Sequence, residues 1–303
     1  MSVQSRIIVF CGKGGVGKTT LSLALGLKHA AAGRKVVVVS SHPLAELAVS
    51  VSLEGLPDRF PMAARNLFVV HLNPKDLLRE LVENNFPVQW VARAVLESDI
   101  YNNLVEVAPG LKEFYFLARL QQLAERHLAA DAPDYELLIW DAPATGHFLS
   151  TLRSARAFET YLSGPLAAAG ADLHHFFSNA ENIVILPTTT LEEMAIQETI
   201  EMCRALERDF QLRPTRLLLN LASPIVDAAP ADVDELERAA AASSDQALRF
   251  ALDRGLVERQ RAADLRAELA SPSLAVERAR QWSGDLDLLA QIGQTLARLE
   301  VLA

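Results

Sequence analysis

A glycine-rich stretch near the start of the chain carries the residues best suited to chemistry. Residues 12–19, GKGGVGKT, match the pattern G-x-x-x-x-G-K-[ST] at every position. Glycines let several backbone N–H groups converge on a chain of phosphates, and a following helix directs its positive dipole end at the same place. Lys18 adds a point charge for the terminal phosphates, and the Thr19 hydroxyl is a ligand for Mg²⁺. The stretch therefore predicts a site for ATP or ADP with Mg²⁺.

A second charged residue with a clear setting ends an apolar run. Residues 137–141, LLIWD, read as a buried strand that finishes on Asp141. A carboxylate at such a strand end holds Mg²⁺ through water in nucleotide-binding proteins of this kind. The predicted metal ligands are therefore Thr19 and Asp141. The residues predicted to bind the nucleotide from the loop are Gly14, Gly15, Val16, Gly17, Lys18, Thr19 and Thr20.

The elements that must position these residues alternate along the chain. Apolar runs predict strands at residues 6–11, 35–40, 66–72, 135–141, 182–188, 215–220 and, with a weaker pattern, 273–278. The order strand, glycine loop, helix, strand forms a βαβ unit, and such units give parallel sheets. We therefore predict an α/β fold, a doubly wound and mostly parallel sheet of the P-loop NTPase type, as one domain over residues 1–303.

Helical patterns fill the spaces between the predicted strands. They cover residues 191–210, 231–269 and 284–302, besides the stretch that follows the glycine loop. Residues 77–128 contain two or three amphipathic helices and no strand, so a helical subdomain is predicted as an insertion at about 73–130. Its bulky residues suit either a plain core or a groove for an apolar client.

Composition excludes several classes of protein. The net charge of −9 over 303 residues argues against a nucleic-acid partner, which usually requires a basic surface. The two cysteines, Cys11 and Cys203, form no CxxC pair, so neither a disulfide framework nor a zinc site is indicated and both are expected to be buried thiols. No apolar run is long enough for a membrane span, and we expect a soluble, cytoplasmic protein.

The loop holds a further lysine, Lys13. With it the motif reads K-G-G-x-G-K-T-T and resembles the deviant Walker A loop of the MinD, ParA, nitrogenase-iron-protein and ArsA group of ATPases. In that group the extra lysine reaches across a dimer interface to the nucleotide of the partner. The resemblance implies a dimer in which Lys13 acts in trans.

Three other stretches are similar to the ArsA and Get-pathway branch of this group. Residues 141–147, DAPATGH, resemble its D-T-A-P-T-G-H switch II, where His147 would sense the γ-phosphate. Residues 108–120 resemble its P-G-x-x-E segment ahead of a helix, and residues 185–199 its strand and helix after switch II. Asn220 stands where the family places an asparagine against the adenine ring. The resemblance covers nearly the whole chain.

One position departs from that family in a way that bears on catalysis. Switch I reads roughly S-T-D-P-A-H-x-L in the family, and residues 40–47 read SSHPLAEL, so His42 replaces the aspartate that orients or deprotonates the attacking water. A protonated imidazole would instead pair with phosphate. We expect ATP hydrolysis to be slow or lost, with Glu46 as a substitute base left open.

These observations predict an ATP-binding, dimeric ArsA/Get-like protein with weak or lost hydrolysis. Its predicted role is that of a nucleotide-dependent partner or regulatory subunit of a paralogous ATPase, as a homodimer or a heterodimer with that paralogue. The catalytic candidates are Lys13, His42 and Asp141. One alternative is an active ATPase that targets or remodels a membrane or hydrophobic client. Another is a positioning ATPase of the ParA/MinD type, against which the Thr-Gly-His of switch II argues.

Overall fold

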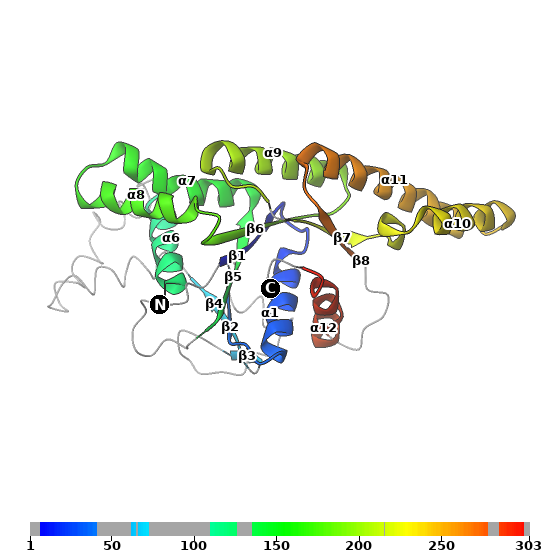
Figure 1. The fold of residues 1–303 in the computed structure, drawn as a ribbon, viewed down its shortest axis with the longest axis horizontal. Coiled ribbons are helices and arrows are strands. Elements are labelled where there is room, and N and C mark those ends of the chain that lie inside the picture. The colour runs from blue at the N-terminus through cyan, green and yellow to red at the C-terminus, as the bar shows by residue number, and fades with distance from the viewer. Residues whose placement is uncertain are drawn as a thin grey trace, which may run out of the picture.

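The computed structural model describes the chain in seven stretches. These are residues 7–40, 62–64, 66–72, 110–125, 135–214, 216–277 and 285–299. Within them the strands form one sheet of eight, in the order β3-β4-β2-β5-β1-β6-β7-β8 (Figure 1). The β3–β4 pair is antiparallel and the other pairs are parallel. The predicted α/β fold with a mostly parallel sheet is confirmed.

Each of the seven predicted strands is present. The strands are β1 (Ile7–Gly12), β2 (Val36–Ser40), β3 (Met62–Ala64), β4 (Leu67–His71), β5 (Leu137–Ala144), β6 (Ile183–Thr189), β7 (Leu217–Ala222) and β8 (Ser273–Glu277). β3 was not predicted, because its sequence MAA is too short to carry a periodic pattern. It lies at the edge of the sheet and pairs with β4.

The helices surround this sheet. They are α1 (Lys18–Ala31), α6 (Leu111–Ala124), α7 (Thr145–Tyr161), α8 (Pro165–Phe177), α9 (Glu193–Phe210), α10 (Pro230–Ala242), α11 (Gln246–Leu269) and α12 (Asp285–Leu296), with a 3₁₀ helix η1 (Pro224–Asp227). The helical pattern predicted over residues 231–269 is split in two. The carboxylate of Asp245 accepts hydrogen bonds from the backbone N–H groups of Ala247 and Leu248 and so caps the start of α11.

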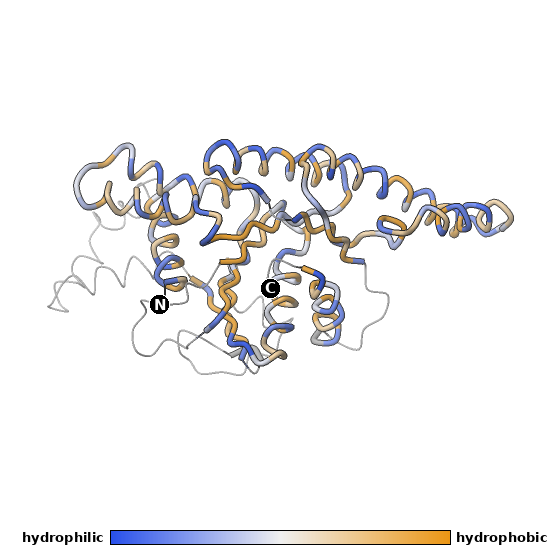
Figure 2. Tube along the Cα trace, viewed as in Figure 1, coloured by the Kyte–Doolittle hydropathy of each residue, from blue (hydrophilic) through white to orange (hydrophobic). Residues whose placement is uncertain are grey.

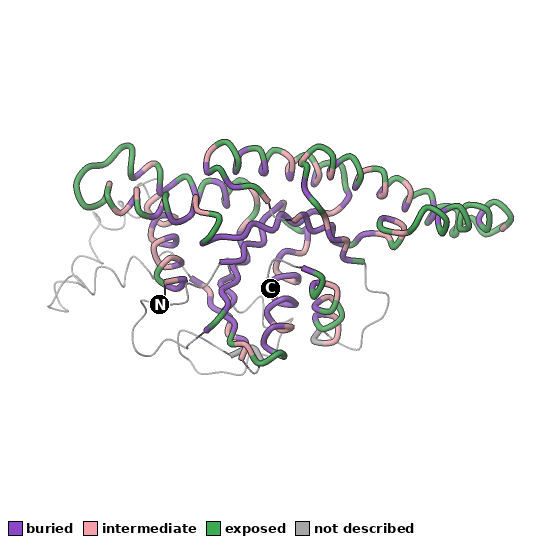
Figure 3. The backbone as a smooth tube through the Cα atoms, in the orientation of Figure 1, coloured by how far each residue is buried: buried purple, intermediate pink, exposed green. Residues whose placement is uncertain are grey.

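Apolar side chains cover both faces of the sheet. In β1, Ile7 and Val9 pack toward the layer of α6, α7, α8 and α9, whereas Ile8 and Phe10 pack toward α1 and α12. All four are fully buried. Parallel strands covered by helices on both faces are apolar without interruption, which is why they were readable in the sequence. Figures 2 and 3 show the strands as apolar and buried, whereas α10 and the adjoining part of α11 are largely exposed and project from the body.

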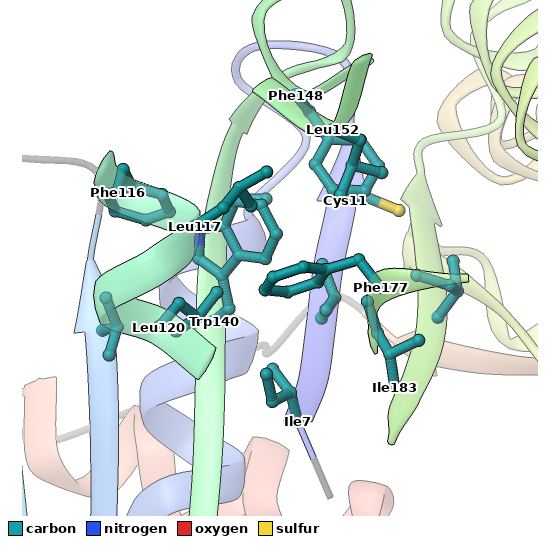
Figure 4. Packing of buried hydrophobic residues seen from close by; sticks show 14 of the residues in the cluster. Ile7, Cys11, Phe116, Leu117, Leu120, Trp140, Phe148, Leu152, Phe177 and Ile183 are labelled. Atoms are coloured by element: carbon teal, nitrogen blue, oxygen red, sulfur yellow. The ribbon is translucent and has the colours of Figure 1, made fainter. Parts of the chain in front are cut away.

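Trp140 is the centre of the larger core cluster. Its ring centroid lies 5.3 Å from that of Phe116 on α6, 5.4 Å from that of Phe148 on α7 and 6.5 Å from that of Phe177 on α8 (Figure 4). Aromatic rings at such separations add attraction to the area that they bury. Three helices are thus anchored on the residue that precedes Asp141.

Most of the helical insertion predicted at about 73–130 lies outside the described residues. Its described part is α6, where Phe114 and Phe116 are buried in the core cluster and therefore do not line a groove. None of the helices that the structure describes has the length and apolar character required to cross a membrane.

Candidate nucleotide-binding site

The alternation of two neighbouring strands brings the polar residues of the site together. Val38 in β2 and Ile139 in β5 pack in the apolar cluster on the α1 side of the sheet. Two residues further along each strand, the same faces carry Ser40 and Asp141, which are direct partners across the parallel pair. The Thr19 hydroxyl at the start of α1 donates a hydrogen bond to Asp141 Oδ2 at 2.7 Å, and the Ser40 hydroxyl lies 3.3 Å from the same oxygen.

At two glycines of the loop, any other residue would have a strained backbone and would displace a neighbouring group. Gly17 has φ +91°, and a Cβ atom there would lie 2.3 Å from Nδ2 of Asn220. Gly12 has φ +142°, and a Cβ atom there would lie 2.1 Å from the carbonyl oxygen of Thr188 in β6. The loop therefore follows β6 and β7 closely, and glycines allow the backbone to make such an approach.

Lys18 is a buried cation at the centre of this loop. Its side chain is 6% exposed, and Nζ donates a hydrogen bond to the carbonyl oxygen of Lys13 at 2.9 Å. Burial lowers the pKa of Lys18 below its ordinary value, whereas the nearby carboxylate of Asp141 opposes that shift. An anion bound in the loop would lower the free energy of the charged form further.

Asn220 contacts the phosphate loop directly. It is 6% exposed, and its Nδ2 donates a hydrogen bond to the carbonyl oxygen of Val16 at 2.8 Å. Since Asn220 lies at the carboxyl end of β7, this bond joins the loop to the strand. The predicted contact of Asn220 with an adenine ring stays a prediction.

Lys13 has a partner that the sequence did not indicate. Its Nζ lies 2.9 Å from Oε1 of Glu198 in α9, and the two side chains are 29% and 38% exposed. In the sequence Glu198 is one of several glutamates on an amphipathic helix, and nothing in that pattern distinguishes it from the others. Only the position of α9 beside the loop selects it.

The residues after Asp141 form the end of β5 and the first turn of α7. Gly146 and His147 are exposed there, and the carbonyl oxygen of His147 accepts a hydrogen bond from the Thr151 hydroxyl at 2.8 Å. The stretch predicted as switch II thus begins on a strand and continues into a helix at the same edge of the sheet as the loop. The stretch predicted as switch I, with His42 and Glu46, lies outside the described residues after Ser40.

Both cysteines are buried free thiols, as predicted. Burial raises the pKa of Cys203 to about 12 and that of Cys11 well above its ordinary value, so neither supplies a thiolate near neutral pH. Among the described residues, no group of three or more His, Cys, Asp and Glu side chains is arranged to hold a metal ion.

The donors at the site suit Mg²⁺. Mg²⁺ prefers oxygen ligands and usually takes one or two from the protein, with water and phosphate oxygens completing its shell. The hydroxyl of Thr19 and the carboxylate of Asp141 are already in contact and supply such a set. The structure therefore gathers four of the predicted residues, Lys18, Thr19, Asp141 and Asn220, around one loop. Thr20 follows them in the first turn of α1, where it is half-buried.

The chain is similar to known proteins over this part of the fold. The profile of a family described as anion-transporting ATPase, ArsA, matches residues 5–215. The ATPase BagA of Mycobacterium tuberculosis is 26% identical over 204 residues, which cover 65% of this chain and 59% of the relative. A putative arsenical pump-driving ATPase of Aquifex aeolicus is 29% identical over 165 residues, which cover 52% of each chain.

Another relative is a longer protein, of which the match covers a smaller share. The ATPase ARSA1 of Chlamydomonas reinhardtii is 28% identical over 175 residues, which cover 49% of this chain and 22% of that protein. The matched region thus spans only part of each of these relatives.

The closeness of Asn220 to the position of a Cβ atom at Gly17 predicts the effect of adding a single methyl group there. We expect Gly17→Ala to lower the free energy of unfolding by about 1–3 kcal/mol, because alanine is strained at this φ and its Cβ would displace Asn220. Gly146→Ala is the matched control: a Cβ atom there meets nothing within 4 Å, and alanine favours the first turn of α7. Urea denaturation of both variants checks this, and equal effects would contradict the assigned contact.

Proposed function

The chain belongs to the ArsA family of anion-transporting ATPases, and from that premise we propose that it binds Mg·ATP and ADP in the loop formed by residues 12–19. The observation that carries the proposal is the convergence of Lys18, Thr19 and Asp141 at the N-terminus of α1. Lys18 and the N–H groups of the helix would bind the phosphates, and Thr19 and Asp141 would hold Mg²⁺. The metal ion supplies positive charge that offsets the charge of the phosphates.

Hydrolysis in this proposal is weak or lost, because His42 takes the place of the family's switch I aspartate. An aspartate at this point accepts a proton from water and orients that water toward the γ-phosphate. A neutral imidazole is a poorer substitute, and a protonated one would pair with phosphate and stabilise bound ATP. Such a site would hold bound ATP for a long time and hydrolyse it slowly.

The proposed state is a dimer in which Lys13 reaches the nucleotide of the other subunit. A subunit that binds ATP but hydrolyses it poorly is most useful beside one that hydrolyses well. We therefore propose a role as nucleotide-dependent partner or regulatory subunit of a paralogous ATPase, with a homodimer as the competing arrangement. In a heterodimer this chain could donate Lys13 to a competent site, much as an arginine finger acts in trans.

Nucleotide binding is tested by thermal unfolding. Millimolar Mg·ATP or ADP is expected to raise the melting temperature by on the order of 5 °C, because a ligand at about a hundred times its Kd stabilises the folded state by roughly 2.7 kcal/mol. Lys18→Ala should remove most of that shift. Lys28→Ala, which removes a lysine from the last turn of the same helix, should leave the shift intact. A melting temperature that Mg·ATP does not change would refute the proposal.

The role of His42 is tested by restoring the family residue. We expect His42→Asp to raise the rate of phosphate release by about tenfold or more, since a positioned general base contributes roughly 10²–10⁴-fold. The measurement compares wild type and variant at matched protein and Mg·ATP concentrations. A fast wild-type rate that the substitution lowers would instead favour an active ATPase in which His42 participates.

The partner is tested by purification from the native cell. We expect a paralogous ATPase to co-purify with this chain in the presence of Mg·ATP, and Lys13→Ala in this chain alone to lower the ATPase rate of the pair. If a paralogue co-purifies and its rate is unchanged by that substitution, Lys13 does not act in trans. Recovery of this chain only with itself would exclude the heterodimer.

A further inference from the structure

The donor side chains around the phosphate loop are bonded to groups of the same chain. The ammonium of Lys18 donates a hydrogen bond to the carbonyl oxygen of Lys13, and the amide of Asn220 donates one to the carbonyl oxygen of Val16. The ammonium of Lys13 forms an ion pair with the carboxylate of Glu198. The backbone carbonyl group of Lys13 is thus bonded to Lys18, and its side chain is paired with Glu198 of α9.

Glu198 is held in a fixed position relative to the loop. It lies in the second turn of α9, between Ala195 and Thr199, which are 1% and 0% exposed and fix the helix against the core. The strand that leads into α9 is β6, and the carbonyl oxygen of its Thr188 lies against Gly12 at the start of the loop. Loop and helix therefore both adjoin the same strand, and only three residues separate β6 from α9.

The ion pair between Lys13 and Glu198 orients the lysine side chain, yet a nucleotide can break it. Both side chains are partly exposed, and exposed ion pairs contribute little to stability. A triphosphate carries several negative charges against the single charge of a carboxylate, so it attracts the same ammonium more strongly. Unlike a structural ion pair between two surface helices, this one involves a cation of the phosphate loop itself.

We propose that Glu198 is a positioning residue, which holds the Lys13 ammonium while the nucleotide site is empty and yields it to the triphosphate when the site is filled. The proposal rests on the nucleotide binding proposed above. It assigns to α9 a share in setting the affinity: breaking the Lys13–Glu198 pair is part of the work of binding ATP. The same step applies whether Lys13 then contacts the nucleotide of its own subunit or that of a second copy.

The test removes the charge of Glu198 and measures the apparent affinity for a non-hydrolysable Mg·ATP analogue by calorimetry. Glu198→Gln is expected to tighten binding about two- to fivefold, the range that corresponds to the loss of one exposed ion pair. Glu201→Gln, which makes the same charge change at an exposed position of the same helix, is the control and should leave the affinity unchanged. In a Lys13→Ala background, Glu198→Gln should have no effect.

Each outcome separates this proposal from the one on which it depends. If the wild type binds the analogue and Glu198→Gln leaves the affinity unchanged, or changes it equally with and without Lys13, the positioning role is wrong. An equal gain in affinity from Glu201→Gln would show that the effect comes from the overall charge of the protein. That result would also overturn the positioning role. If the wild type does not bind at all, the proposed function fails first, and this inference with it.

Three further measurements make the result specific. The melting temperature of Glu198→Gln without nucleotide should match that of the wild type, since the pair is exposed, and Glu198→Asp should give a smaller gain in affinity. Repeating the titration at a tenfold higher protein concentration identifies the triphosphate that receives Lys13. A gain that grows with concentration assigns it to a second copy, and a constant gain assigns it to the same chain; both support the release from Glu198.

Discussion

Two buried charges, those of Lys18 and Asp141, set the main constraint on this structure. A buried ion without a partner is strongly destabilising, so each must be surrounded by groups that compensate it. Lys18 is bonded to the carbonyl oxygen of Lys13, and Asp141 accepts hydrogen bonds from the hydroxyls of Thr19 and Ser40. These partners come from the loop, from α1 and from β2. The sheet has to bring them within hydrogen-bond distance, and the core fixes the strands that do so.

The core does so through the alternation of the strands. In β5, Trp140 faces α6, α7 and α8 and is held by three aromatic rings, which fixes the backbone one residue before Asp141. Asp141 then necessarily faces the other side, where α1 begins. A shift of one residue in the register of β5 would exchange the two faces, bury the carboxylate among aromatic rings and place the indole on the side of α1, where the phosphate loop lies. The stability of the fold and the geometry of the site therefore have the same origin.

The parts of the site that lie within one motif or one strand were predictable. Residues 12–19 and Asp141 follow from residue type, spacing and the apolar run before them, because those signals are local. The contact of Glu198 with Lys13 was not predictable, since it depends on where α9 lies after folding. The break before α11 was missed although Ser243 and Asp245 interrupt an alanine-rich run.

The internal bonds of the loop also affect how tightly any ligand can bind. Because the ammonium of Lys18, the amide of Asn220 and the ammonium of Lys13 are all bonded within the chain, a ligand exchanges existing contacts for new ones. The affinity then reflects a difference between two sets of bonds, as the net strength of a hydrogen bond in water does. Bonds of this kind fix the side chains of the loop, and groups that are already ordered lose little entropy on binding. It also favours ligands with several negative charges, because one of the groups to be replaced, the Glu198 carboxylate, is itself charged.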